Sequence, residues 1–420
     1  MRLSPFLIAR QKFPSYRISD IQGEVHRALE SAHLGAGLKS GSTVAIGVGS
    51  RGIANIDGIV HAIVSWWQAR GMKPFLFPAM GSHGAASAKG QTAVLAKYGI
   101  TEVAMGCPIR SSLDVVSLGR SAEGIETVMD RNAHSADGVM LCARVKWHTD
   151  FAGTLESGLF KMMAIGLGKF EGAKRYHAFA HTLGLERVIR SVGRQVLSCG
   201  KILGGLAILE DGNHDTARLA AVGVEEMEQR EMELLALVKT WMPRIPVEHL
   251  HFLLVDQIGK NLSGSGMDPK VINRSVHGAY NPWPFAPRVD RVYLRGIHPL
   301  SYGNAVGFGM ADVVHDRLLK NMAKKPTWVN GITSGTMASI KTPVHYASDR
   351  RCLEETWRTA GCHDPSELKI GWIRNSQDLS MMAFTENLRA ELEGNPDVEI
   401  LSGGRELEFD EAGDLREWLT

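Results

Sequence analysis

Residues 43–78, TVAIGVGSRGIANIDGIVHAIVSWWQARGMKPFLFP, contain the pattern that decides the fold. Two apolar, strand-like runs at 43–48 and 74–78 flank an amphipathic stretch at 56–70, in which apolar residues recur at helical spacing. This order of strand, helix and strand predicts a βαβ unit with parallel strands and helices on both faces of the sheet. The alternation continues with a helical pattern at 87–98 and a strand-like run at 138–145.

The length of the chain, 420 residues, predicts two domains rather than one core. The glutamate-rich helix expected at 223–241 is followed by Pro243 and Pro246, which end it and mark a boundary near residue 245. We therefore expect an N-terminal catalytic and cofactor-binding α/β domain at 1–245 and a C-terminal α/β domain at 246–420. The fold class is two α/β domains with mostly parallel sheets and an interdomain active-site cleft.

The second half repeats the α/β pattern. An apolar strand is expected at 249–255, and a glycine-rich turn, YGNAVGFGMAD, is expected to open a helix that runs to Met322. Further strands are expected at 289–294, at 368–373 and near Val398, and a further helix at 348–359.

Composition excludes several classes of protein. The 47 basic and 45 acidic residues nearly cancel, and no stripe of Lys or Arg alternates with aromatic residues, which argues against a nucleic-acid partner. The five cysteines lie far apart without a CxxC pair, which argues against a disulfide framework or a zinc ribbon and favours a reducing compartment. No apolar run is long enough for a membrane span, so we expect a cytoplasmic protein with no membrane contact.

Polar residues follow three of the predicted strands. Arg51 lies in VGSRGIANI, His83 in PAMGSHGAAS and His148 in VKWHTDFAG. Ligands bind outside the carboxyl ends of parallel strands, and an arginine there can hold a carboxylate or phosphate through two hydrogen bonds. The sequence therefore predicts a binding site at this edge of the first sheet.

Four more residues are candidates for the same site. Lys161 lies in the apolar run ESGLFKMMAIGLG, where a lysine either extends outward to solvent or is held as a nucleophile or cofactor anchor. His177, in AKRYHAFAH, is a candidate metal ligand, although its side chain does not select the metal. Gln257 and Lys260, in VDQIGKNLSGSG, follow the first strand of the second domain and suit an anionic ligand.

The order and spacing of these residues resemble the nickel-pincer-nucleotide-dependent lactate racemase superfamily of 2-hydroxyacid racemases and epimerases. The resemblance rests on SRG at Arg51, GSHG at His83, HTDFAG at His148, a lysine followed sixteen residues later by a histidine, and QIGK at 257–260. The run HTDFAGTLESGLFK is longer than the HxxAGxSGGxK typical of the family. Lys169 and Lys174 are the alternative lysines, but only Lys161 has the sixteen-residue interval to His177.

The resemblance implies a role for each residue. His83 and His148 correspond to the catalytic bases, Lys161 to the covalent anchor of the nickel-pincer nucleotide and His177 to the protein ligand of nickel. Arg51, Gln257 and Lys260 correspond to the groups that bind the substrate carboxylate and carbonyl oxygen. The implied reaction is racemisation or 2-epimerisation of a small 2-hydroxy acid by proton-coupled hydride transfer through a 2-keto acid, and the implied partners include the cofactor-synthesis enzymes.

Two alternatives remain open from the residues alone. A zinc-dependent hydrolase or lyase would use His83, His148 and His177 directly as metal ligands. A non-catalytic protein that binds a carboxylate or phosphate would need Arg51 and Lys260 but not the histidines.

Overall fold

The computed structural model describes residues 1–49, 52–416 and 418–419. The chain divides into two compact units: one comprises Pro14–Met242, and the other comprises Met1–Phe13 together with Pro243–Thr420. Each unit contains its own sheet, so the chain has the mixed α/β fold that the alternation of strands and helices predicted.

The sheet of the Pro14–Met242 unit has five strands in the order β3-β2-β6-β7-β8. The first four strands are parallel and β8 is an antiparallel edge. The βαβ unit predicted at residues 43–78 is confirmed as β2 (Thr43–Val48), α2 (Ile56–Ala69) and β3 (Lys73–Pro78). The other strands are β6 (Gly138–Arg144), β7 (Ile202–Glu210), β8 (Thr216–Val222) and the separate hairpin of β4 (Val115–Arg120) and β5 (Glu126–Asp130).

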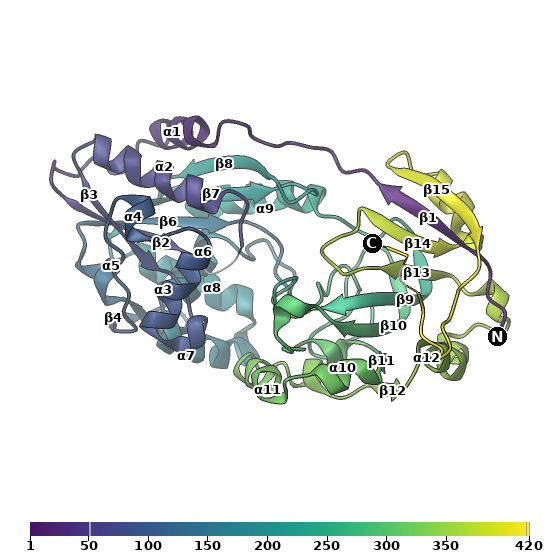
Figure 1. The fold of residues 1–420 in the computed structure, drawn as a ribbon. Coiled ribbons are helices and arrows are strands. Elements are labelled where there is room, and N and C mark those ends of the chain that lie inside the picture. The colour runs from purple at the N-terminus through teal and green to yellow at the C-terminus, as the bar shows by residue number, and fades with distance from the viewer. Residues whose placement is uncertain (50–51, 417, 420) are drawn as a thin grey trace. The chain divides into compact units, whose positions relative to one another are not determined.

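Apolar residues that alternate along the strands build a core on each face of this sheet. Val44 and Ile46 of β2 pack into one core with α1 (Ile21–Ser31) and α2. Phe75 and Phe77 of β3 enter the opposite core, which also contains residues of α7 (Lys169–Leu183), α8 (Leu185–Leu197) and α9 (Met227–Trp241). Figure 1 shows α1 and α2 on one side of the sheet and α7 and α8 on the other. The remaining helices of the unit are α3 (Ala88–Lys97), α4 (Glu102–Met105), α5 (Arg131–Ser135), α6 (Leu159–Lys161), α7 (Lys169–Leu183), α8 (Leu185–Leu197) and α9 (Met227–Trp241), with a 3₁₀ turn η1 (Gly84–Ala86) and a π-helix η2 (Met162–Gly166).

The sheet of the other unit has eight strands in the order β12-β11-β10-β9-β13-β14-β1-β15. The strands from β12 to β13 are parallel, and the pairs beyond β13 are antiparallel. The strands are β1 (Phe6–Gln11), β9 (His249–Ile258), β10 (Arg288–Ile297), β11 (Val313–His315), β12 (Val344–Tyr346), β13 (Ile370–Ile373), β14 (Met381–Thr385) and β15 (Val398–Arg405). A parallel block with an antiparallel extension is a common arrangement in α/β proteins.

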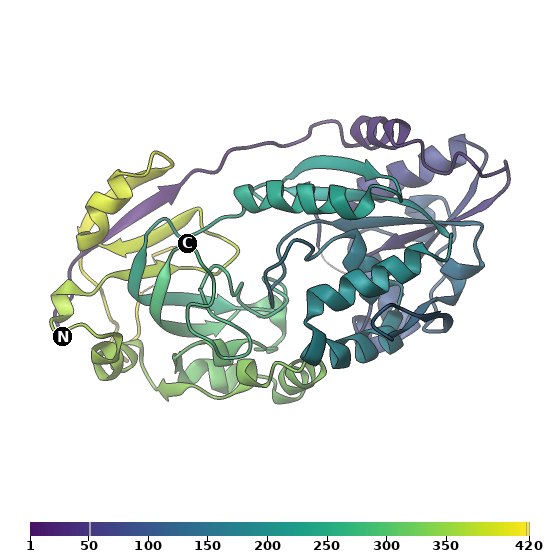
Figure 2. The same ribbon diagram turned by 180° about the vertical axis from the view of Figure 1, so that it is seen from behind.

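The first strand of the chain belongs to this second sheet, whereas the sequence pattern predicts one domain at residues 1–245. β1 pairs with β14 on one side and β15 on the other, and Figure 2 shows it beside these C-terminal elements. Phe6 is fully buried and stacks edge-on against Trp418. The physical reason for the difference is that this pairing joins residues almost a whole chain length apart, which no local pattern records.

The structure also differs from the prediction that one helix runs from the glycine-rich turn to Met322. The turn forms a 3₁₀ segment, η4 (Phe308–Met310), and the chain then enters strand β11 before the short helix α10 (Asp316–Asn321). Val313 and Val314 pair with Tyr293 and Leu294 of β10, because β-branched side chains fit a buried parallel strand. The other elements of the unit are α11 (Lys324–Thr333), α12 (Asp349–Thr356), α13 (Arg389–Glu393), η3 (Pro299–Ser301), η5 (Met337–Ile340), η6 (Trp357–Ala360), η7 (Pro365–Glu367) and η8 (Glu386–Leu388).

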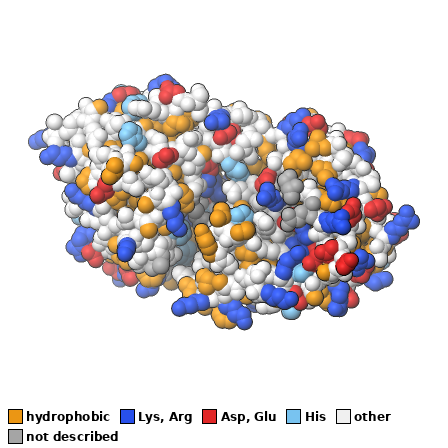
Figure 3. Space-filling view, in the orientation of Figure 1, with side chains coloured by type: hydrophobic (Ala, Val, Ile, Leu, Met, Phe, Trp, Pro, Cys, Tyr) orange, Lys and Arg blue, Asp and Glu red, His pale blue; other side chains and the backbone are white. Residues whose placement is uncertain are grey.

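The surface of both units carries mixed charge. Figure 3 shows basic and acidic side chains interspersed over the face drawn, as the near-neutral net charge of +2 leads one to expect. Within the described ranges, no helix has both the length and the apolar character that crossing a bilayer requires.

Candidate active site

The parallel strands of the first sheet bring two predicted site residues to one edge. His83 follows the carboxyl end of β3, and His148 follows the carboxyl end of β6, with β2 lying between these strands. Neighbouring strands are about 4.8 Å apart, so the ends of β3 and β6 lie roughly 10 Å apart. Arg51 follows β2, but it lies outside the described residues.

The loop that carries His83 packs closely on the segment between Lys161 and His177. A Cβ added to Gly81 would lie 3.1 Å from both Ala173 Cβ and Ile165 Cγ2, so the loop backbone approaches this segment more closely than most residues with a Cβ allow. His83 itself is half-buried and precedes the 3₁₀ turn η1.

His148 is oriented by its own loop. Its Nδ1 accepts a hydrogen bond from the backbone N–H of Asp150 at 3.1 Å, and its ring stacks on Phe151 with 4.7 Å between centroids. Because Nδ1 accepts, a neutral imidazole in this geometry carries its proton on Nε2. In that tautomer, His148 offers Nε2–H as a hydrogen-bond donor.

A buried carboxylate holds the backbone of the same loop. Glu156 is fully buried and accepts hydrogen bonds from the N–H groups of His148 and Gly153. Its Oε1 also lies 2.6 Å from the Nζ of Lys239 on α9. The loop is thus fixed to the adjacent helix by a charge-assisted contact, which is stronger than one between neutral groups.

Lys161 and His177 interact electrostatically. Lys161 ends the single turn α6, and the π-helix η2 follows directly, an irregularity that is frequent at functional sites. Burial lowers the pKa of His177, and the positive charge of Lys161 lowers it further, while Asp150 opposes both effects. His177 is accordingly a neutral imidazole at neutral pH, which is the form that binds a metal ion.

Glu231 of α9 supports the turn that ends at Lys161. Its Oε2 accepts a hydrogen bond from the N–H of Phe160 at 2.9 Å. A Cβ at Gly158 would lie only 2.3 Å from Glu231 Oε1, so the carboxylate fills the space next to this glycine. Burial raises the pKa of Glu231 to about 7, which outweighs the effect of the backbone hydrogen bonds.

The two alternative lysines are engaged elsewhere. Lys169 is fully buried, and its Nζ donates hydrogen bonds to Pro78 O at 2.7 Å and to Gln91 Oε1 at 2.6 Å. Lys174 is exposed on α7 and forms an ion pair with Glu171 at 3.7 Å. Of the three lysines, Lys161 is the one whose charge acts on His177.

Gln257 and Lys260 lie in the other unit, at the carboxyl end of β9. Lys260 donates through its backbone N–H to Ser301 Oγ at 3.0 Å and through Nζ to Gly264 O at 2.6 Å. Gln257 Oε1 is buried and has no hydrogen-bond partner within the described part of the chain. An orphaned polar atom of this kind suits a ligand that donates a hydrogen bond.

Within the described ranges, His83, His148 and His177 do not belong to a close group of three potential metal ligands. Over the described ranges, two groups of three potential ligands have their atoms within 4.8 Å of one another, and neither contains His83, His148 or His177. The first group is His249, His251 and Asp290, and the second is His315, Asp349 and Asp414.

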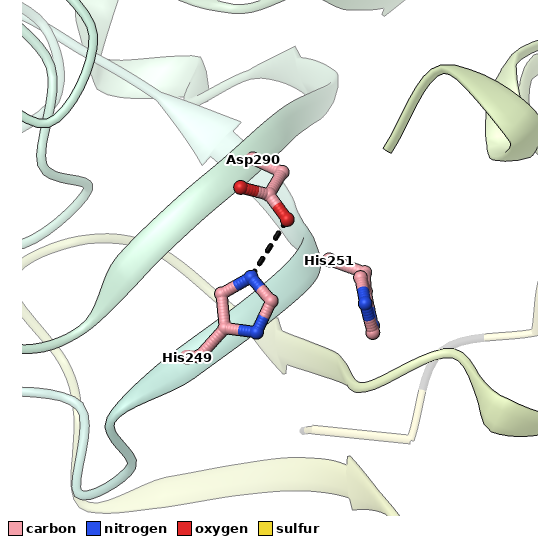
Figure 4. A group of neighbouring side chains, drawn as sticks. All are labelled: His249, His251 and Asp290. Atoms are coloured by element: carbon pink, nitrogen blue, oxygen red, sulfur yellow. Dashed lines mark hydrogen bonds and ion pairs between the residues drawn. The ribbon is translucent and has the colours of Figure 1, made fainter. Parts of the chain in front are cut away.

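Hydrogen bonds within these two groups account for their closeness. His249 Nε2 lies 2.6 Å from Asp290 Oδ2, with His251 beside them (Figure 4). His251 Nδ1 accepts the N–H of Lys369, which places the proton of the neutral ring on Nε2 and leaves neither nitrogen poised to bind a metal. In the second group, His315 Nε2 lies 2.7 Å from Asp414 Oδ1, and Asp349 forms an ion pair with Arg295 at 2.9 Å.

Three residues of this region, Gln91, Glu156 and Glu231, were not site candidates from the sequence, and the structural role of Lys169 was not predicted either. Glu156 and Glu231 are acidic residues next to apolar runs, a pattern that is also usual on helix and loop surfaces. Only tertiary contacts show that both are buried under the chain from His148 to Lys161.

Comparison with known proteins finds solved structures with a similar fold but no matching family. No family model matches the sequence, and no curated protein matches it as a relative. Among solved structures, a structural-genomics protein from Thermotoga maritima shares 12% identity over 87% of this chain and 97% of its own, with a TM-score of 0.51. The lactate racemase apoprotein from Thermoanaerobacterium thermosaccharolyticum shares 11% identity over 84% of this chain and 91% of its own, with a TM-score of 0.47. The likeness to the Thermotoga protein extends to the fold alone, and that to the racemase apoprotein is too distant to bear on function.

Proposed function

We propose that this chain is a racemase or 2-epimerase of a small 2-hydroxy acid that uses a nickel-pincer nucleotide. The observation that supports the proposal best is the pair of Lys161 and neutral His177 on a segment packed against the His83 loop. The reducing cytoplasm is the proposed compartment, because all five cysteines are free thiols.

The residues present fit the cofactor. A lysine amine is the group that forms a covalent link to an organic acid, and a neutral imidazole is a suitable nickel ligand. Lys161 would hold the nucleotide and His177 would coordinate its nickel. When bound, the nickel-pincer nucleotide supplies an acceptor for the hydride of the substrate Cα.

The protein's own groups supply the proton chemistry and the substrate contacts. His83 and His148 follow strands of one parallel sheet edge, where each would exchange the hydroxyl proton with one enantiomer of the substrate. Arg51, Gln257 and Lys260 would bind the carboxylate and the carbonyl oxygen of the substrate.

The test uses protein produced together with the cofactor-synthesis enzymes. Racemisation is measured for lactate, malate, aromatic 2-hydroxy acids and aldonates, and intact-mass analysis looks for an adduct that is lost in Lys161→Ala but kept in Lys174→Ala.

Zinc without an adduct would support the hydrolase or lyase, and ligand binding that survives His83→Ala with no turnover would support the non-catalytic binding protein. Solvent deuterium at Cα during turnover would contradict hydride return.

A further inference from the structure

Lys169 is a buried cation at the start of the helix that carries His177. Its side chain has no exposed surface, and its Nζ contacts Pro78 O, Gln91 Oε1 and, at 3.6 Å, Asp130 Oδ2. Burial lowers the pKa of Lys169, while the carboxylate of Asp130 opposes this effect. Lysine is almost never fully buried unless it is paired, so this position carries a specific requirement.

The backbone at Lys169 is also unusual. Its φ is +54°, in the left-handed region that favours glycine, although Gly168 directly precedes it. A residue with a Cβ is strained in this conformation, and the surrounding contacts have to hold it there. The Lys169 side chain reaches the carboxyl end of β3, where the His83 loop begins.

Gln91 continues the connection from Lys169 to the His83 loop. It is fully buried on α3, and its Nε2 donates hydrogen bonds to Met80 O at 3.2 Å, to Gly81 O at 3.0 Å and, at 3.5 Å, to His83 O. Its Oε1 accepts from Lys169, so the ammonium group orients the amide, and the amide in turn holds carbonyl groups of the loop. Gly81 packs against Ile165 and Ala173 on the other side.

We propose that Lys169 and Gln91 are positioning residues that hold the His83 loop against the segment carrying Lys161 and His177. These buried hydrogen bonds connect the loop of the proposed base, His83, to the segment that carries the proposed cofactor anchor, Lys161, and metal ligand, His177. The consequence for catalysis rests on the proposed function, but the positioning of the loop does not.

The test replaces Gln91, because Lys169→Met would leave Asp130 buried without its ion-pair partner and could prevent folding. Gln91→Met has a similar volume and keeps the Lys169–Asp130 pair, while it removes the hydrogen bonds of the amide to the loop and to Lys169. Thr92→Val is the matched control on the same helix, since Thr92 Oγ1 donates only to Ala88 O within α3.

The first measurement is hydrogen exchange of the protein without cofactor. In Gln91→Met, amides of residues 79–87 are expected to exchange about tenfold faster, as loss of about one net hydrogen bond predicts, while peptides from β7 and the Thr92→Val protein remain as in wild type. Unchanged exchange at 79–87, or an equal increase throughout residues 14–242, would overturn the proposal.

The second measurement is turnover by the cofactor-loaded protein. Misplacement of a base lowers kcat with little change in KM, and we expect at least a tenfold loss of kcat in Gln91→Met. A wild-type kcat in this variant, or a loss confined to KM, would overturn the positioning role. If the wild-type protein shows no racemisation, the proposed function fails, while hydrogen exchange still decides whether Gln91 holds the loop.

Discussion

Glu156 accepts a hydrogen bond from the backbone N–H of His148, and its other carboxylate oxygen contacts Lys239 of α9. A buried acidic side chain therefore fixes the start of the loop that leads from one predicted base to the predicted anchor, Lys161. Glu231 fixes the end of the same stretch through the N–H of Phe160. The longer run between His148 and Lys161 is thus an ordered segment with carboxylates as internal supports.

Removal of the Glu156 carboxylate is expected to destabilise the protein. Glu156→Ala leaves the N–H groups of His148 and Gly153 and the ammonium of Lys239 without their acceptor, at a cost of about 3 kcal/mol in the free energy of unfolding. Denaturant unfolding measures the cost. Glu233→Ala, on the exposed face of α9, is the control and should leave the midpoint unchanged. Equal midpoints for the two variants would show that Glu156 does not support the loop.

Glu231 is expected to make stability depend on pH. Its pKa is raised to about 7 in the folded protein, so its contribution is fully present below the unfolded value of 4.5 and is lost as the pH rises through 7. The loss is on the order of 3 kcal/mol between these limits. Urea unfolding at pH 5 and pH 8 measures it, and Glu231→Gln, which cannot ionise, should show a smaller difference between the two. A difference equal to that of wild type would contradict the assignment.

The charges around His177 are expected to shift its pKa in opposite directions. Lys161→Met removes a positive charge that lowers this pKa, so the pKa should rise, whereas Asp150→Asn removes a charge that raises it, so the pKa should fall. Titration of the His177 ring by NMR in protein without cofactor measures both shifts. Lys174→Met is the control and should leave the pKa unchanged. A similar shift in all three variants would mean that Lys161 does not act on His177 directly.

Asp349 is expected to limit stability in acid. Burial alone would raise its pKa, but hydrogen bonds and the charge of Arg295 hold it at about 2. Its contribution is therefore present above the unfolded value of 3.8 and is lost as the pH falls towards 2, a change of about 2 kcal/mol. In Asp349→Asn the protein should be less stable at pH 7, because Arg295 keeps a weaker partner, and unfolding should lose this part of its pH dependence between 4 and 2. A pH profile parallel to that of wild type would refute the prediction.

Local chemistry made most of the first sheet predictable. The predicted strand at residues 43–48 has the same first and last residues as β2, because its β-branched and apolar residues are bounded by small and polar ones. The predicted helix at 56–70 extends one residue beyond the end of α2. The positions of His83 and His148 after β3 and β6 follow from the same alternation. Their catalytic roles, and those of the other predicted site residues, remain predictions.

The sequence by itself determined the α/β alternation, the strand-end placement of polar residues and the interval between Lys161 and His177, because these depend on neighbours along the chain. Only the tertiary structure decided that β1 joins the second sheet and that Val313 and Val314 form a strand. Only the tertiary structure also showed the burial of Lys169 and Glu156 beneath the candidate site. The physical reason is that strand partners and buried ion pairs are selected by contacts between distant segments, whose free energy outweighs local preference.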